Sequence, residues 1–222
     1  MVGDIAVSVV GLGRSYRAAR GEVWAFRGID LEVRSGSLTV LAGPSGSGKS
    51  TLLRIIAAVD RPTEGAVTID GIEIGGMSDH ARRKWRGKRL GFVFQDPAEN
   101  LLPYLTVADH LDLAAHLRGS GASWQHLAEH LEISPLLDEL PERLSSGQQQ
   151  RVALAMAAVG DPAVVVADEP TAELDQASAW LAIDTLRALS DGGSTVVVSS
   201  HDADVIRSCD AVHRLEHHQD TA

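Results

Sequence analysis

The chain contains the stretch Gly43-Pro44-Ser45-Gly46-Ser47-Gly48-Lys49-Ser50, followed by Thr51, which fits the pattern G-x-x-x-x-G-K-[ST]. A continuous apolar run at 38–42 precedes it, as in a buried parallel strand, and residues 49–59 have a helical pattern. Glycines allow such a loop to curl so that main-chain N–H groups point inward, and the helix N-terminus favours an anion there. An ordinary Gly/Ser loop with an accidental lysine is the alternative, which the flanking strand and helix disfavour. We predict that residues 43–51 bind nucleotide phosphates, with Lys49 on the β- and γ-phosphates and the Ser50 hydroxyl on Mg²⁺.

Outside this loop, short apolar runs predict further strands. They lie at 38–42, 90–94, 164–167 and 195–199, and the last three each end in polar residues. Strands that alternate with helices imply an α/β fold with a mostly parallel sheet, and ligands bind such sheets at the carboxyl ends of the strands.

The middle of the chain has a helical character instead. Thr106 to Asp109 resemble a capping box, and Val107, Leu111 and Ala114 follow at helical spacing. We therefore predict one domain, 1–222. Its core is formed by 1–95 and 161–222, and a helical subdomain at 96–160 is inserted between them.

Two adjacent carboxylates follow the strand at 164–167. Asp168 is expected to bind Mg²⁺ through water, and Glu169 to act as the general base on the attacking water. An acidic residue at the end of a strand can also simply cap a turn. The phosphate-binding loop upstream favours the metal and general-base roles.

The segment Leu144-Ser145-Ser146-Gly147-Gln148 precedes Asp168 and Glu169 by about one helix. This pairing resembles the signature and Walker B motifs of the ATP-binding cassette (ABC) ATPases. Tyr16, Gln95, Asp175 and His201 follow the family's order, so the resemblance covers essentially the whole chain. It implies a P-loop NTPase fold with an N-terminal antiparallel β-subdomain.

The resemblance also implies roles for single residues. His201 would contact the γ-phosphate and orient the water, as a catalytic residue beside Glu169 and Lys49. Gln95 would sense the γ-phosphate or Mg²⁺, so the metal set would be Ser50, Gln95 and Asp168. Tyr16 would stack on adenine, although Trp24 and Phe26 lie nearby and are alternatives.

In this family the signature segment acts in trans. Ser145, Ser146, Gly147 and Gln148 would face the γ-phosphate held by a second subunit, with Asp175 at the same interface. The implied assembly is a dimer, most simply a homodimer, around two Mg-ATP.

The sequence departs from the family pattern at two places. Ser146 replaces the usual first glycine of the signature, and the segment after Gln95 is longer than in many relatives. The first suggests slower hydrolysis, and the second leaves the identity of the membrane partner open.

Bulk composition narrows the function classes further. The formal net charge of -10 disfavours nucleic acid as a partner, because phosphate neutralisation needs clustered Lys and Arg. The basic residues between Arg82 and Arg89 are expected to form a solvated face.

With one cysteine, Cys209, no intrachain disulfide can form, so a reducing compartment is expected. No signal peptide and no membrane-spanning run are expected.

Together with these observations, the resemblance implies a cytoplasmic ATPase, peripheral on the inner face of the cell membrane, that works with an integral membrane permease. The length of the chain and the residues from Ser78 to Gln95 resemble the lipoprotein-releasing, macrolide-export and cell-division group. Within that group, a signalling module that moves no substrate is the alternative. A soluble ABC ATPase of DNA repair or translation is less favoured, because those relatives generally carry tandem cassettes, coiled coils or zinc modules.

Overall fold

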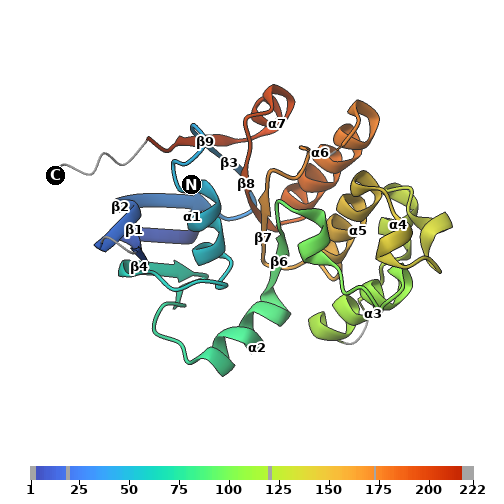
Figure 1. Ribbon diagram of the computed structural model, residues 1–222, viewed down its shortest axis with the longest axis horizontal. Coiled ribbons are helices and arrows are strands. Elements are labelled where there is room, and N and C mark those ends of the chain that lie inside the picture. Colours follow the sequence, from blue (N-terminus) through green and yellow to red (C-terminus); the bar gives the residue numbers. More distant parts are fainter. Residues whose placement is uncertain (1–3, 19–20, 120–121, 173, 217–222) are drawn as a thin grey trace.

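In the computed structural model, which describes residues 4–18, 21–119, 122–172 and 174–216, the strands form two sheets of different kinds (Figure 1). An antiparallel sheet has the order β2-β1-β4-β5, and a parallel sheet has the order β6-β7-β8-β3-β9. The first comprises β1 (Ile5–Ala18), β2 (Gly21–Arg34), β4 (Glu64–Ile69) and β5 (Ile72–Glu73). The second comprises β3 (Leu38–Ala42), β6 (Leu90–Val93), β7 (Val164–Asp168), β8 (Thr195–Ser199) and β9 (Ala211–Arg214). The predicted parallel core and antiparallel subdomain are both confirmed.

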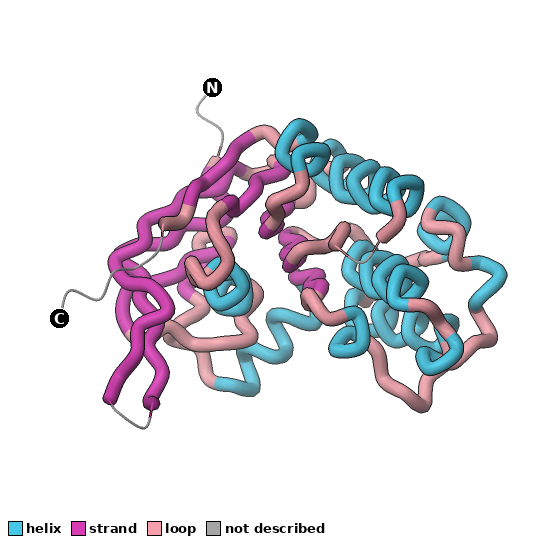
Figure 2. Tube along the Cα trace, turned by 45° about the horizontal axis from the view of Figure 1, so that its top comes forward, coloured by secondary structure: helices cyan, strands magenta, loops and turns pink. Residues whose placement is uncertain are grey.

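Helices α3, α4 and α5 gather at the end of the molecule opposite the antiparallel sheet, whereas α1 lies beside that sheet (Figure 2). Between β6 and β7 the chain forms η1 (Pro97–Asn100), α3 (Val107–Arg118), α4 (Gln125–His130), η2 (Ser134–Leu136), η3 (Pro141–Arg143) and α5 (Ser146–Ala158). The remaining helices are α1 (Lys49–Ile56), α2 (Asp79–Arg89), α6 (Gln176–Asp191) and α7 (Ala203–Ser208). The expected capping box is present at α3, where Thr106 and Asp109 bind each other's main-chain N–H groups. Among the described residues, no helix combines the length and apolarity needed to cross a bilayer.

Two elements end earlier than the sequence predicts, each for a local reason. The helix expected at 49–59 ends at Ile56, because Ala58 takes a left-handed conformation (φ 54°) that stops the helix. The strand expected at 90–94 ends at Val93, because the main-chain N–H and C=O of Phe94 both bind the side chain of Asn100.

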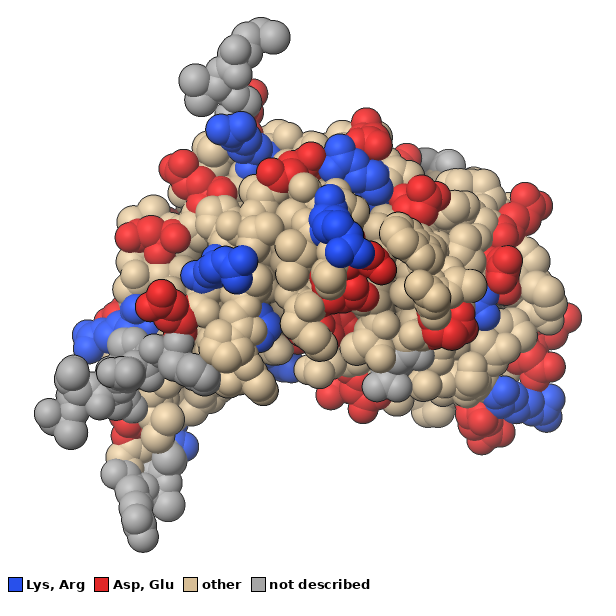
Figure 3. All heavy atoms as spheres, turned by 90° about the horizontal axis from the view of Figure 1, so that it is seen from above, with Lys and Arg blue, Asp and Glu red and all other residues tan. Residues whose placement is uncertain are grey.

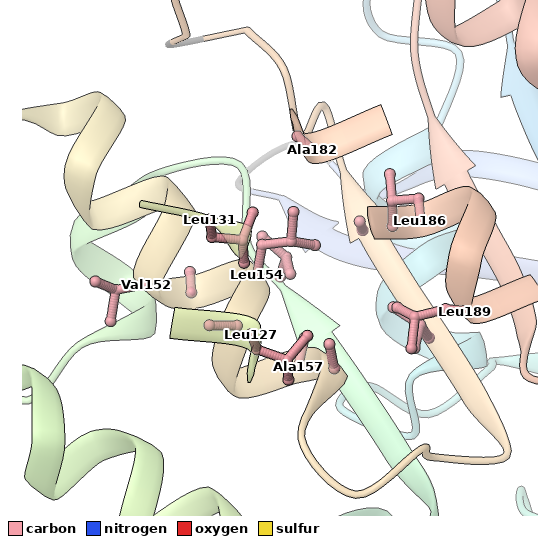
Figure 4. Packing of buried hydrophobic residues seen from close by; sticks show 14 of the residues in the cluster. Leu127, Leu131, Val152, Leu154, Ala157, Ala182, Leu186 and Leu189 are labelled. Atoms are coloured by element: carbon pink, nitrogen blue, oxygen red, sulfur yellow. The ribbon is translucent and has the colours of Figure 1, made fainter. Parts of the chain in front are cut away.

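The parallel sheet is buried on both faces. In β7, Val164 and Val166 belong to a hydrophobic cluster with α1 and the antiparallel sheet, whereas Val165 and Ala167 belong to a cluster with the helices. This alternation is the period of a strand, and it explains why the strand is apolar throughout. The second cluster continues from α4 through α5 to α6 (Figure 4). Its labelled members are Leu127, Leu131, Val152, Leu154, Ala157, Ala182, Leu186 and Leu189.

One close approach joins the inserted helices to the edge strand of this sheet. A Cβ atom at Gly91 of β6 would overlap the main-chain oxygen of Ala157 in α5, so no larger residue fits there without a shift of the backbone. The helix and strand backbones can touch at this point because residue 91 has no side chain.

The basic residues of α2 are only partly a solvated face. Arg82 and Arg86 donate hydrogen bonds to the main-chain oxygens of Asp60 and Ala58, at 3.4 and 3.1 Å, and so attach α2 to the segment after α1. Arg83, Lys84, Lys88 and Arg89 are exposed, as predicted. On the face seen in Figure 3, the Lys and Arg side chains of the described residues are interspersed with Asp and Glu.

His110 is a buried histidine whose contacts fix its neutral form. The residue is 1% exposed, Nδ1 lies 2.7 Å from the main-chain oxygen of Thr106, and Nε2 lies 2.7 Å from the main-chain nitrogen of Leu102. Because a carbonyl only accepts and an N–H only donates, Nδ1 carries the hydrogen and Nε2 accepts. Burial lowers the pKa of His110, against smaller opposing effects of the Thr106 bond and the Asp109 charge.

We expect His110 to make the fold less stable in mild acid. Below the ordinary histidine pKa of about 6.5, the unfolded chain takes up a proton that the folded chain resists, so the free energy of unfolding falls as pH falls. Carboxylates with lowered pKa, such as Asp175, change the free energy of unfolding with pH only near pH 4 and below. Urea unfolding of the wild type and of His110→Gln between pH 7.5 and 5.5 measures this effect. The variant should show a smaller loss of stability over this range, and an equal loss in both proteins would contradict the assignment.

Candidate nucleotide site

The carboxyl ends of β3, β7 and β8 open into one cavity of about 620 Å³, a size typical of small-molecule sites. The predicted site residues that line it are Gly43, Pro44, Ser45, Gly46, Gly48, Lys49, Ser50, Thr51, Gln95, Asp168, Glu169 and His201. The structure therefore brings together residues that are up to 158 positions apart, as His201 and Gly43 are. The position agrees with the rule that parallel sheets bind ligands at the carboxyl ends of their strands.

The loop between β3 and α1 is closed by its own backbone and by Lys49. Gly48 has a left-handed φ of 86°, and a Cβ there would lie 2.7 Å from Cδ1 of Phe26, so only glycine fits. The Lys49 ammonium donates to the oxygens of Gly43 and Pro44, at 2.8 and 2.9 Å, which holds a positive charge against the loop. Ser47 does not line the cavity, because its side chain is buried in the loop.

Two acidic side chains lie at and just after the end of β7, and they contact residues at and just after the end of β8. Asp168 is 5% exposed, and its Oδ1 accepts a hydrogen bond of 2.5 Å from the Ser199 hydroxyl. Both Glu169 carboxylate oxygens lie 3.1 Å from Nδ1 of His201. The His201 side chain is 80% exposed and that of Glu169 is 13% exposed, so the pair reaches from the sheet into the cavity.

Ser199 is the residue that sequence reasoning missed. Its hydroxyl contacts both acidic residues: it donates to Asp168, and the N–H of Glu169 donates to it at 3.0 Å. The one available signal was its place: a hydroxyl ends a run of valines in a strand that was expected to be buried. That signal does not give the register, which sets Ser199 opposite Asp168.

Several predicted residues lie outside the main cavity. Tyr16 is in β1, 43% exposed, with the Arg14 guanidinium carbon 4.6 Å from its ring centroid. Asp175 is the N-cap of α6, and its hydrogen bonds with the N–H and hydroxyl of Ser178 lower its pKa. Its neighbour Glu173 lies outside the described residues.

The signature segment forms the start of α5. Ser145 caps the helix in a reciprocal pair with Gln148, and the helix begins at Ser146. Ser145, Gly147 and Gln148 do not line the main cavity. Ser146 lines a second cavity of about 540 Å³.

The residues predicted for Mg²⁺ fit that ion. Ser50, Gln95 and Asp168 line both the main cavity and the cavity of Ser146, so the three side chains converge on one region. Together they offer a hydroxyl, an amide oxygen and a carboxylate, the hard oxygen ligands that Mg²⁺ takes in combination with phosphates and water.

Comparison with known proteins gives consistent results. The family described as "ABC transporter" matches residues 26–172. An ABC transporter ATP-binding protein of Thermotoga maritima is 40% identical, over 90% of this chain and 87% of its own. The lipoprotein-releasing system ATP-binding protein LolD of Zymomonas mobilis is 35% identical, over 93% and 90%. The macrolide export ATP-binding/permease protein MacB of Syntrophobacter fumaroxidans is 34% identical over 91% of this chain, which is 29% of that longer protein.

Among solved structures, the chain is similar to the ATP-binding cassette MJ0796 in a dimeric post-hydrolysis state bound to ADP and Pi. The TM-score is 0.87 at 34% identity, and the match covers 96% of this chain and 97% of the other. The fold, the family match and the relatives agree with the resemblance to the lipoprotein-release and macrolide-export group. The chain therefore belongs to the ABC transporter family, as an ATP-binding cassette with the P-loop NTPase fold.

Proposed function

We propose that this cassette hydrolyses ATP and, as a dimer around two Mg-ATP, drives substrate translocation by a separate membrane permease. The observation that carries the catalytic part is the cavity that joins Lys49, Glu169 and His201 with Ser50, Gln95 and Asp168. Phosphate binding, a general base and a set of metal ligands thus share one space.

The chemistry follows from these positions. The loop N–H groups and Lys49 bind the β- and γ-phosphates, which fixes the γ-phosphorus near Glu169. Glu169 accepts a proton as water attacks that phosphorus, and the bond to the β–γ bridging oxygen breaks to give ADP and phosphate. His201, 3.1 Å from Glu169, holds the carboxylate and reaches toward the γ-phosphate. Bound Mg²⁺ would neutralise charge on the phosphates, held by Ser50, Gln95 and Asp168.

The place of the signature segment supports a dimer. None of its four residues lines the main cavity of their own chain, and the N-terminus of α5 is a favourable site for an anion. A second copy can bring its phosphates there, with Asp175 at the same interface. The resemblance to a dimeric ADP- and Pi-bound cassette adds support. The relatives named for lipoprotein release and for macrolide export with a permease support a permease partner. A place on the inner face of the membrane would follow from that partner.

Purification from detergent-solubilised native membranes tests the transport role. We expect Glu169→Gln to retain a multi-span membrane protein when Mg-ATP is present, because a base-deficient cassette stays closed on its nucleotide. The matched control is Glu169→Gln with Lys49→Ala, which should lose the ATP dependence. A dimer that forms with ATP but captures no membrane protein would contradict the transport role. A captured protein with a large extracytoplasmic domain and no substrate flux in vesicles would favour signalling.

A further inference from the structure

Ser199 occupies the position where the two acidic residues of the site meet. It is the last residue of β8, it is fully buried, and the register of the parallel sheet sets it opposite Asp168. Its hydroxyl donates to Oδ1 of Asp168 at 2.5 Å and accepts from the N–H of Glu169 at 3.0 Å. One hydroxyl therefore contacts the carboxylate of the first residue and the backbone of the second.

The bond to Asp168 restricts how that carboxylate can turn. With Oδ1 held by Ser199, rotation about the bond to the carboxyl group is limited, and the other oxygen is left for the cavity that Asp168 lines. A ligand carboxylate that is held by a second group loses less freedom when it binds a metal.

The bond to Glu169 supports an unusual backbone conformation. Glu169 has φ of 47°, the left-handed region that a glutamate seldom adopts. Its N–H donates to two acceptors on one residue, the Ser199 oxygen at 3.2 Å and the Ser199 hydroxyl at 3.0 Å. From this backbone the side chain reaches His201 at 3.1 Å. The three residues immediately before Ser199 in β8 are Val196, Val197 and Val198, none of which carries a hydroxyl.

We propose that Ser199 is a positioning residue for ATP hydrolysis, whose hydroxyl orients the Asp168 carboxylate toward Mg²⁺ and fixes the backbone from which Glu169 acts. The proposal rests on the proposed function of Asp168 and Glu169. Ser199 itself does not touch the reacting atoms, and it acts through these two residues.

A pair of variants with the same shape tests the hydroxyl alone. Ser199→Thr keeps the oxygen and Ser199→Val replaces it by a methyl group, so both add the same bulk to the buried site. Thr195→Val is the matched control, because it removes a buried hydroxyl from the other end of β8, where the partner is the N–H of Gly36. Ser199→Ala provides a smaller variant that needs no extra space.

Four quantities are measured for each variant: kcat for ATP, KM for ATP, the thermal midpoint, and the affinity for Mn²⁺ with a non-hydrolysable ATP analogue, read by electron paramagnetic resonance. We expect Ser199→Val and Ser199→Ala to lower kcat and to weaken Mn²⁺ binding, each by about tenfold or more, with KM for ATP changed less than about twofold. Ser199→Thr should recover most of both losses, and Thr195→Val should keep wild-type values for kcat and Mn²⁺.

Equal kcat and Mn²⁺ affinity in Ser199→Thr and Ser199→Val would overturn the proposal, whether both match the wild type or both fall together. If Ser199→Val does not fold, a Ser199→Ala protein with wild-type kcat and Mn²⁺ affinity would overturn it equally. A wild-type protein that does not hydrolyse ATP would instead contradict the proposed function, so the two failures are distinguishable.

Discussion

Replacing Glu169 by Gln is expected to lower the rate of ATP hydrolysis by about 10²- to 10⁴-fold, the usual contribution of a positioned general base. Glutamine has the size of glutamate but accepts no proton at neutral pH. The Glu169 side chain is 13% exposed at the edge of the cavity and contacts His201, so the exchange changes the chemistry with little change in shape. Phosphate release under saturating Mg-ATP measures the rate.

Binding of the nucleotide should survive this change. We expect the affinity of Glu169→Gln for a fluorescent ATP analogue to stay within about threefold of the wild type, because the phosphate contacts of residues 43–51 are untouched. Lys49→Ala is the opposite control, and it should lose binding and hydrolysis together. A Glu169→Gln protein that hydrolyses ATP within tenfold of the wild type would assign the general base to another group.

The largest effect on stability is expected from Gly91→Ala. The added methyl group would overlap the main-chain oxygen of Ala157, and a backbone oxygen cannot rotate away as a side chain can. Either α5 or β6 must shift, at a cost of about 3 kcal/mol, the upper end of the usual range for an overpacked core position. Urea or thermal unfolding measures the change.

Gly87→Ala is the matched control for this prediction. Gly87 lies inside α2, and a Cβ there would meet Cδ2 of Leu117 at 3.9 Å, an ordinary contact. Alanine is the better helix former, so this variant should be more stable than the wild type by about 0.5 to 1 kcal/mol. Equal stability of Gly91→Ala and the wild type would show that α5 adjusts freely against the sheet.

Much of the fold could be predicted from local patterns. The valine runs at 164–167 and 195–199 predict buried strands because both faces of a parallel strand need apolar side chains. The loop at 43–51 and the capping box at Thr106 are read from spacing alone, since each depends on neighbours within a few residues. The convergence of Gln95, Asp168 and His201 follows from one further step, because polar residues at the ends of parallel strands meet at one edge of the sheet.

The remainder depends on contacts between distant parts of the chain. The role of Ser199 requires the register of β8 against β7, which no local pattern specifies. The closeness of Gly91 to Ala157 depends on how α5 crosses the sheet. The left-handed Ala58 that ends α1 early accepts a hydrogen bond from Arg86 of α2, and Asp60 accepts one from Arg82. Neither contact is visible in the spacing of residues 49–59.

The neighbouring strands β6 and β7 are separated in the chain by residues 94–163, which contain α3, α4 and α5. Pairing them closes a long loop, and the chain loses conformational entropy in this closure before the edge of the sheet gains its hydrogen bonds. The contact of α5 with Gly91 reduces this entropic cost, because a helix already docked on β6 shortens the loop that must still close. We expect the inserted helices and the edge strand to form in one kinetic step, so folding would be slowed by any change that loosens α5.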